Sequence, residues 1–92
     1  MNHKLLRIAN ELNKLILHSD AKVECQFTRR ESGIITVFLF HIDDRYEVGA
    51  SHLYISTNCS DEEVQEVYEQ MKRVIAGEAL IGEADCNLFN QA

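Results

Sequence analysis

The sequence lacks the features of membrane-spanning and of secreted chains. No apolar run approaches the roughly 18 residues that a spanning helix needs, and the first residues lead into an amphipathic segment instead of a secretory hydrophobic region. Its three cysteines, Cys25, Cys59 and Cys86, form an odd set without regular spacing, whereas disulfide-stapled secreted domains carry an even and denser one. We therefore expect reduced thiols, no membrane contact and a cytoplasmic location.

Motifs for nucleotides and for metals are also missing. The four glycines are scattered over different predicted elements, which excludes a glycine-rich phosphate loop. The nearest approach to a zinc site, His41, His52 and Cys59, lacks paired ligands a few residues apart. The adjacent carboxylates Asp43 and Asp44 are typical of a solvated turn. We therefore expect no enzyme activity, no metal and no other cofactor.

Apolar spacing predicts a helix and two strands in the first part of the chain. Apolar residues recur at helical intervals over residues 4–18, which predicts a helix. Alternation over residues 22–29 predicts a strand that turns Cys25 inward, where small thiols are common and inert. The run 34–42 follows a hairpin turn at Gly33 and is apolar on both faces, as a central strand of a sheet normally is.

A third strand is predicted after a tight turn at Asp43 and Asp44. Apolar residues alternate over residues 45–56, but the parity of the alternation changes within residues 49–52. A β-bulge would absorb the extra residue, and a glycine inside a strand often marks one. A short loop between two separate strands would explain the same pattern.

A second helix is predicted over residues 60–77. Ser60 and Glu63 have the spacing of a capping box, in which each residue satisfies a free backbone N–H of the other. Gly77 can end the helix in a left-handed cap. We expect the remaining residues, 78–92, to dock against the body of the protein.

The predicted order is helix, three antiparallel strands and helix (αβββα), an α+β fold with both helices on one face of the sheet. A chain of 92 residues has room for one hydrophobic core, so we expect residues 1–92 to form a single domain. The composition, 46% apolar and 26% charged, supports a packed core over a disordered chain.

Charge is distributed unevenly along the sequence. The net charge is -6, but residues 1–42 carry +2 and residues 43–92 carry -8. An acidic surface repels nucleic acid and attracts basic surfaces, including those with which proteins hold nucleic acid. Solubility alone is the alternative explanation.

Carboxylates concentrate at the start of the predicted second helix. Glu62, Glu66 and Glu69 lie about one turn apart on one face, with Asp61 and Glu63 close by, and we call these five residues the acidic ridge. Like charges at this spacing destabilise a helix slightly unless something basic meets them. The ridge is therefore either a binding surface or an ordinary solvated face.

A smaller basic spot is predicted from Lys22, Arg29 and Arg30. These side chains could contact phosphate or an acidic partner. Three charges do not distinguish a binding site from ordinary surface.

The predicted element order is similar to that of double-stranded RNA-binding domains, which read A-form shape partly through a basic helix start. The corresponding positions here are Ser60, Asp61, Glu62 and Glu63, which would repel phosphates. RNA binding through this surface is therefore rejected.

The element order of residues 4–77 and the acidic ridge resemble those of small phage-encoded anti-CRISPR proteins, in particular inhibitors of type I complexes. The resemblance implies a non-enzymatic inhibitor that binds the guide-RNA backbone subunits of a host nucleoprotein effector complex. Target hybridisation would then be blocked by occupancy, with a possible guide-RNA contact through Arg29 and Arg30.

Two alternatives remain open. A DNA-mimic anti-restriction or anti-nucleoid protein would share the acidic ridge but would need a dimer to spread charge along a duplex, and the sequence fits a monomer or a homodimer equally. A small enzyme or ligand-binding module would use His41, His52 and Asp43 or Asp44 in a concave pocket.

Overall fold

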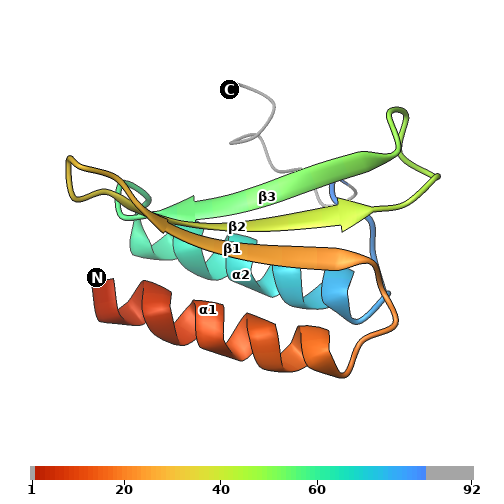
Figure 1. The fold of residues 1–92 in the computed structure, drawn as a ribbon, viewed down its shortest axis with the longest axis horizontal. Coiled ribbons are helices and arrows are strands. Elements are labelled where there is room, and N and C mark those ends of the chain that lie inside the picture. Colours follow the sequence, from red (N-terminus) through yellow and green to blue (C-terminus); the bar gives the residue numbers. More distant parts are fainter. Residues whose placement is uncertain (1, 83–92) are drawn as a thin grey trace.

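The computed structural model describes residues 2–82, which form a helix, three antiparallel strands and a second helix (Figure 1). This αβββα arrangement confirms the fold that the sequence predicts. All five elements lie close to their predicted positions, and only the start of the third strand differs substantially. The elements are α1 (Asn2–Leu17), β1 (Val23–Arg29), β2 (Ile35–Ile42), β3 (Ala50–Ser56) and α2 (Asp61–Ile75).

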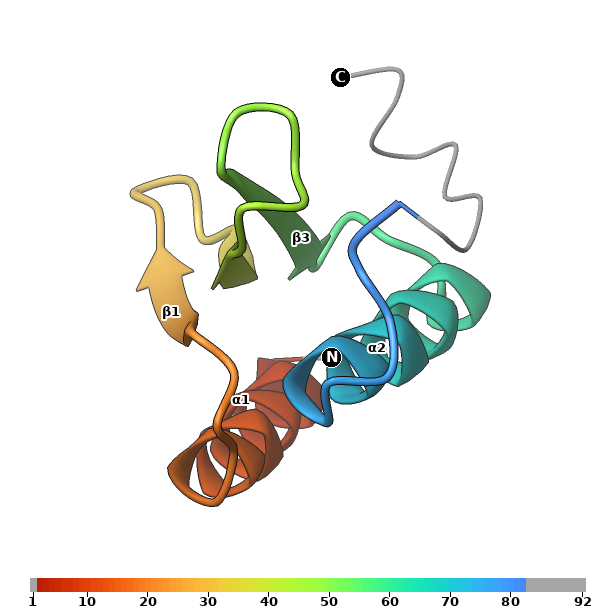
Figure 2. The ribbon, with the colours of Figure 1, turned by 90° about the vertical axis from the view of Figure 1, so that its right-hand side faces the viewer.

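The two helices lie side by side on one face of the sheet (Figures 1 and 2). β2 lies between β1 and β3, which confirms the central position predicted for it. α1 packs beneath β1 and β2, and α2 packs beneath β3. Within the described part of the chain, no helix covers the opposite face, which we call the open face.

The antiparallel register assigns each strand residue to one of the two faces. Leu39 of β2 pairs with Cys25 of β1 and with Leu53 of β3, and such paired residues point to the same side of a sheet. Leu39 and Leu53 are fully buried against the helices, and burial raises the pKa of the Cys25 thiol. The core between the layers comprises Leu5, Ile8, Ala9, Leu12, Ile35, Val37, Leu39, Leu53, Ile55, Val64, Val67, Met71, Val74 and Ile75.

Both ends of α2 are fixed by the residues that the sequence singles out. Ser60 Oγ accepts a hydrogen bond from Glu63 N at 3.2 Å, and Glu63 Oε1 accepts one from Ser60 N at 2.7 Å, so the predicted capping box is confirmed. At the other end Gly77 has a φ of 79°, and Glu78 N donates to Arg73 O at 2.9 Å. This left-handed glycine cap satisfies a terminal carbonyl, as predicted.

The third strand begins at Ala50, so the predicted start at residue 45 is wrong. Residues 43–49 instead form consecutive turns, in which Tyr46 N donates to Asp43 O at 3.2 Å and Gly49 N donates to Tyr46 O at 3.1 Å. The Asp43 side chain accepts from Arg45 N, which stabilises the first turn. Gly49 has a φ of 85°, a backbone conformation that a regular strand does not use.

The predicted bulge within residues 49–52 is also absent. The ladder between β2 and β3 is unbroken from the Ile42–Ala50 pair to the Thr36–Ser56 pair. Because the change of alternation falls inside the turns, the strand has no extra residue to absorb. The connection is therefore a loop between β2 and a single third strand.

The chain returns to the sheet after α2. Figure 2 shows residues 78–82 rising from the end of α2 toward the level of the strands. Ile81 is partly buried against the core, and its N–H donates to Tyr46 Oη at 2.7 Å. This part of the predicted tail therefore docks, whereas residues 83–92, which include Cys86, lie outside the described residues.

Candidate binding surfaces

The acidic ridge lies on the solvent side of α2. Val64 and Met71 are fully buried against the sheet, and Glu62, Glu66 and Glu69 are exposed on the other side of the helix. The helix therefore presents carboxylates outward, as its spacing predicts. Those in the first turn also face the positive end of the helix dipole, which favours negative charge.

Two of the ridge carboxylates already have cationic partners within the chain. Asp61 Oδ1 lies 3.5 Å from Lys4 Nζ of α1, and Glu69 Oε2 lies 2.9 Å from Lys72 Nζ. The hydrogen bond to Glu69 raises the pKa of Lys72, which keeps its ammonium group charged. Exposed pairs of this kind contribute about 0–1 kcal/mol each, but they neutralise part of the ridge.

Glu62 and Glu66 are the ridge residues without such a partner. The Glu63 side chain is occupied by the capping box with Ser60, whereas the side chains of Glu62 and Glu66 make no hydrogen bond or ion pair with any residue of the range 2–82. The two carboxylates lie one turn apart on an exposed surface. They are the part of the ridge that could meet a cation from outside.

The three predicted basic residues do not form one spot. Lys22 lies directly before β1, Arg29 is the last residue of that strand, and Arg30 follows it. Seven steps of about 3.3 Å each separate Lys22 from Arg29, a distance of about 23 Å along the strand. Lys22 is therefore at the opposite end of the strand from Arg29 and Arg30, and only the two arginines are neighbours.

The structure brings Arg30 to the same end of the molecule as the start of the ridge. A surface hollow there is lined by Arg30 from the β1–β2 turn and by Glu63 from α2. Phe38 and Tyr54 from the sheet line the same hollow. Charges of both signs and aromatic rings are thus accessible together at this end.

The open face carries an aromatic cluster that the sequence analysis did not identify. It consists of Phe38 and Phe40 from β2 with His52 and Tyr54 from β3. The rings of Phe38 and Phe40 stack with centroids 5.8 Å apart, and Phe38 to Tyr54 and Phe40 to His52 measure 5.9 and 5.8 Å. The cluster explains the doubly apolar run 34–42, because its outward rings pack on one another over the exposed side of the sheet.

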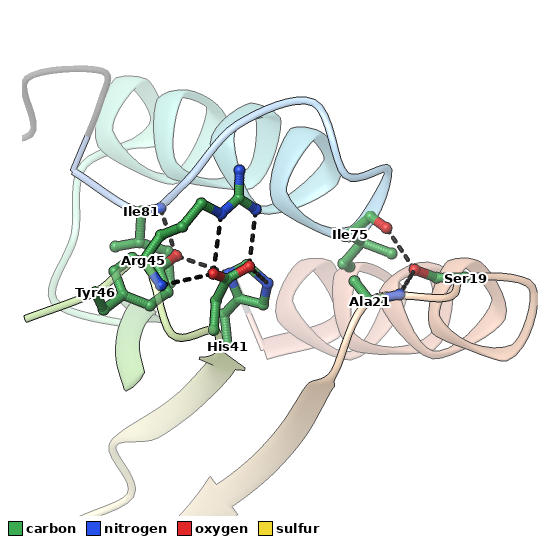
Figure 3. Close-up of polar contacts among 8 residues, drawn as sticks. Ser19, Ala21, His41, Arg45, Tyr46, Ile75 and Ile81 are labelled. Carbon is green, nitrogen blue, oxygen red and sulfur yellow. Dashed lines mark hydrogen bonds and ion pairs between the residues drawn. The ribbon is translucent and has the colours of Figure 1, made fainter. Parts of the chain in front are cut away.

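A second cluster lies where β2 ends, around the buried His41 (Figure 3). His41 Nδ1 lies 2.7 Å from Tyr46 Oη, and the two rings meet edge to face. Tyr46 Oη also accepts the N–H of Ile81 at 2.7 Å, so this hydroxyl links the imidazole of His41 to the segment that follows α2.

The two charged residues beside His41, Asp43 and Arg45, form an ion pair with each other. Arg45 donates from Nε to Asp43 Oδ1 at 2.9 Å and from Nη2 to Asp43 Oδ2 at 2.7 Å, and these bonds hold the pKa of Asp43 far below its usual range. Burial lowers the pKa of His41, and the Asp43 charge opposes that shift only in part. Since His41 Nε2 is 3.9 Å from Asp43 Oδ2, the contact is longer than a hydrogen bond.

His41 and His52 do not share a site. His52 pairs with Phe40 across the sheet, whereas His41 pairs with Ser51, so the two imidazoles point to opposite faces. Of the residues proposed for a small-ligand site, His41, Asp43 and Asp44 line one groove, and His52 lies away from it. The His41 cluster holds Tyr46 and the segment at Ile81 in place, which is a sufficient structural role.

Comparisons with known proteins provide no further guide. No family model, curated protein or solved structure matches the chain. Within residues 2–82, no three His, Cys, Asp or Glu side chains are grouped so as to hold a metal ion. The helices of the same range are too short or too polar to cross a membrane. Function must therefore be argued from the surfaces themselves.

Proposed function

We propose that the chain is a non-enzymatic inhibitor that binds a basic, nucleic-acid-handling complex and blocks nucleic-acid binding by occupancy. The observation that carries the proposal is the pair of exposed carboxylates Glu62 and Glu66, which find no cation within the described chain. Like charges one turn apart destabilise the helix slightly. A basic partner surface would relieve that repulsion and supply the missing counter-charges.

A type I CRISPR surveillance complex is the target class that the resemblance to anti-CRISPR proteins favours. Its backbone subunits would have to bind the guide RNA through basic side chains, which suit the acidic ridge. Arg30 shares a hollow with Glu63, so Arg29 and Arg30 could reach a guide-RNA phosphate beside the same contact. Both proposed contacts then belong to one end of the molecule.

The ridge would govern orientation more than affinity. Exposed ion pairs contribute about 0–1 kcal/mol each, whereas complementary charge accelerates encounter and excludes wrong partners. Two carboxylates therefore select a basic surface, and shape contacts around them supply the remaining affinity. Binding should weaken as salt is added, because exposed charges are screened.

A dimeric DNA mimic is the second candidate. The open face favours it, because an uncovered aromatic surface is a means of joining two copies. Two copies would carry two ridges, as mimicry of a longer charge pattern requires. A small-ligand site remains a prediction only for the groove beside His41 and Asp43.

The proposal is tested with purified type I complexes immobilised through their guide RNA. Wild-type protein is expected to be retained and to prevent capture of target DNA. The double variant Glu62→Lys with Glu66→Lys is expected to lose both effects. A matched control, Glu47→Lys with Glu78→Lys, makes the same change of net charge at two exposed positions outside the ridge.

The control separates a local contact from a general effect of charge. Retention of the control and loss of the ridge variant would support the proposal. Equal retention of both variants would assign the ridge to solvation. If wild-type protein binds no type I complex but competes with duplex DNA for a restriction or nucleoid protein, the DNA-mimic candidate would replace the first.

A further inference from the structure

The open face is apolar at its centre and almost uncharged. Among the strand residues that point to it, Glu24 is the one acidic side chain and none is lysine or arginine. This composition contrasts with the net charge of -6 for the whole chain. Two rows of side chains cross the three strands here: Glu24, Phe40 and His52, then Gln26, Phe38 and Tyr54.

This composition determines which kind of partner the open face fits. A nucleic acid would find rings to stack on and Arg30 beside them, in the hollow with Phe38 and Tyr54, but no lysine or arginine of the strands themselves points to this face to hold phosphates along it. A strongly basic protein would find the single carboxylate of Glu24. The partner that fits this face best is a surface with apolar rings at its centre, a carboxylate on one edge and an imidazole on the other. The open face itself is such a surface.

We propose that the open face binds a second copy of this chain, sheet against sheet. A twofold axis that lies between the sheets and runs along β2 places β1 of each copy over β3 of the other. Each row of one copy then lies opposite the same row of the other copy, because this rotation leaves the position of a residue along the strand direction unchanged. Glu24 meets His52 of the second copy, Gln26 meets Tyr54, and phenylalanine rings cover phenylalanine rings.

In this pairing the apolar side chains of the face are buried and its polar side chains can form hydrogen bonds. Packed sheets lie about 10 Å apart, which is the space that interdigitating rings fill. The Glu24 carboxylate can accept a hydrogen bond from the imidazole of His52, and the Gln26 amide can bond the hydroxyl of Tyr54. Because sheets are twisted, packed sheets are rotated by about 30° relative to each other, and the two rows lie near the centre of that rotation, where the displacement is smallest.

The acidic residues do not oppose this association. Glu62 and Glu66 lie on the side of α2 that faces away from the sheet. In the proposed dimer, α2 of each copy lies on the outer side of its own sheet (Figure 1). Repulsion between the two ridges is therefore reduced by distance and screening. The ridge contact of the inhibitor proposal does not depend on the dimer, since Glu62 and Glu66 lie on the opposite side of the molecule, whereas the hollow that Arg30 shares with Phe38 and Tyr54 lies at the edge of the open face.

Sedimentation equilibrium over a dilution series tests the dimer with a charge exchange. Glu24→Lys would place an ammonium opposite His52, and His52→Glu would place a carboxylate opposite Glu24. Each substitution acts twice by symmetry, so each should weaken the dimer by roughly tenfold or more. The double variant places a lysine opposite a glutamate across the axis and should recover most of the loss.

Two controls keep the result specific. Glu66→Lys makes the same charge change as Glu24→Lys on the far side of the molecule and should leave the dimer intact. Circular dichroism should show that every variant remains folded, because Glu24 and His52 are exposed. Wild-type protein that stays monomeric throughout the series would overturn the proposal, as would folded single and double variants that dimerise equally poorly. Capture of a type I complex would be unaffected by that failure.

Discussion

The two faces of the sheet are built from the same strands but are completed differently. Leu39 points to the helices and is fully buried, whereas its neighbours Phe38 and Phe40 point to the open face and are only half-buried. The helices thus bury every second residue of β2. The residues between these, Phe38 and Phe40, stack on each other on the open face. A strand that is apolar on both faces therefore indicates two covering layers, and the described chain supplies one of them.

The largest expected difference between the faces is in stability. Leu39→Ala should lower the free energy of unfolding by about 2–5 kcal/mol, because it opens a cavity among fully buried side chains. Phe40→Ala should lower it by about 1 kcal/mol, since it loses mainly a ring contact. Urea denaturation of dilute protein measures both values. Equal losses would mean that the open face is also a core.

The helical layer should also be sensitive to its caps. Ser60→Ala removes the side-chain acceptor of the capping box and should lower the free energy of unfolding by about 1 kcal/mol. Urea denaturation followed at a helical wavelength measures the change. Ser51→Ala, a similar truncation in β3 at a side chain without a hydrogen bond among the described residues, is the control and should change much less. An unchanged free energy of unfolding in Ser60→Ala would contradict the claim that the capping box stabilises α2.

The buried His41 should make the stability of the protein depend on pH. Burial lowers the pKa of His41 below its ordinary value of 6.5, so the unfolded chain binds a proton more readily. Stability that is complete above that value should be lost as pH falls toward the lowered pKa. Below the ordinary pKa of 3.8 for Asp43, proton uptake by this carboxyl in the unfolded chain should destabilise the protein further, because Arg45 keeps the folded carboxylate charged.

Urea denaturation at a series of pH values, with one substitution on each face, separates these contributions. His41→Gln should reduce the slope of stability against pH just below neutrality. Gln26→Ala, an exposed substitution on the open face that removes no ionisable group, is the control and should leave that slope unchanged. An equal effect of the two substitutions would contradict the assignment of the slope to His41.

The smallest stability effect is expected at the ridge. Glu62→Lys and Glu66→Lys should each change the free energy of unfolding by no more than about 0.5 kcal/mol, as exposed positions without partners usually do. The same denaturation assay measures this. A loss as large as that of Ser60→Ala would show that these carboxylates are structural, and their effect on binding could not then be read as a contact.

Features that depend on neighbouring residues were predictable from the sequence. The capping box of Ser60 and Glu63 and the glycine cap at Gly77 follow from short-range backbone chemistry and are confirmed. The central place of β2 followed from its apolar composition. The start of the third strand was misplaced because Tyr46 and Val48 imitate strand alternation, while Asp43 and Gly49 fix turns.

Features that depend on pairing between strands were not predictable. The aromatic cluster requires the register that sets Phe40 beside His52, and no local signal contains that register. The separation of Lys22 from Arg29, by contrast, follows from the length of the strand that the sequence predicts over residues 22–29, so the three residues should not have been grouped as one spot. Glu62, Glu66 and Glu69 are exposed on α2, as their spacing predicts, but the pairing of Asp61 with Lys4 depends on how α1 packs against α2.

Histidine modification by diethylpyrocarbonate, read by mass spectrometry at several protein concentrations, tests the contrast between the faces most directly. His3 and His18 are exposed on the helical side and serve as internal references. We expect His41 to be protected at every concentration, and His52 to react in dilute protein and to become protected as concentration rises. Reaction of His52 at an unchanging rate would contradict the claim that a second copy covers the open face. Protection of His52 even in dilute monomer would instead assign that cover to residues 83–92 of the same chain and would contradict it equally.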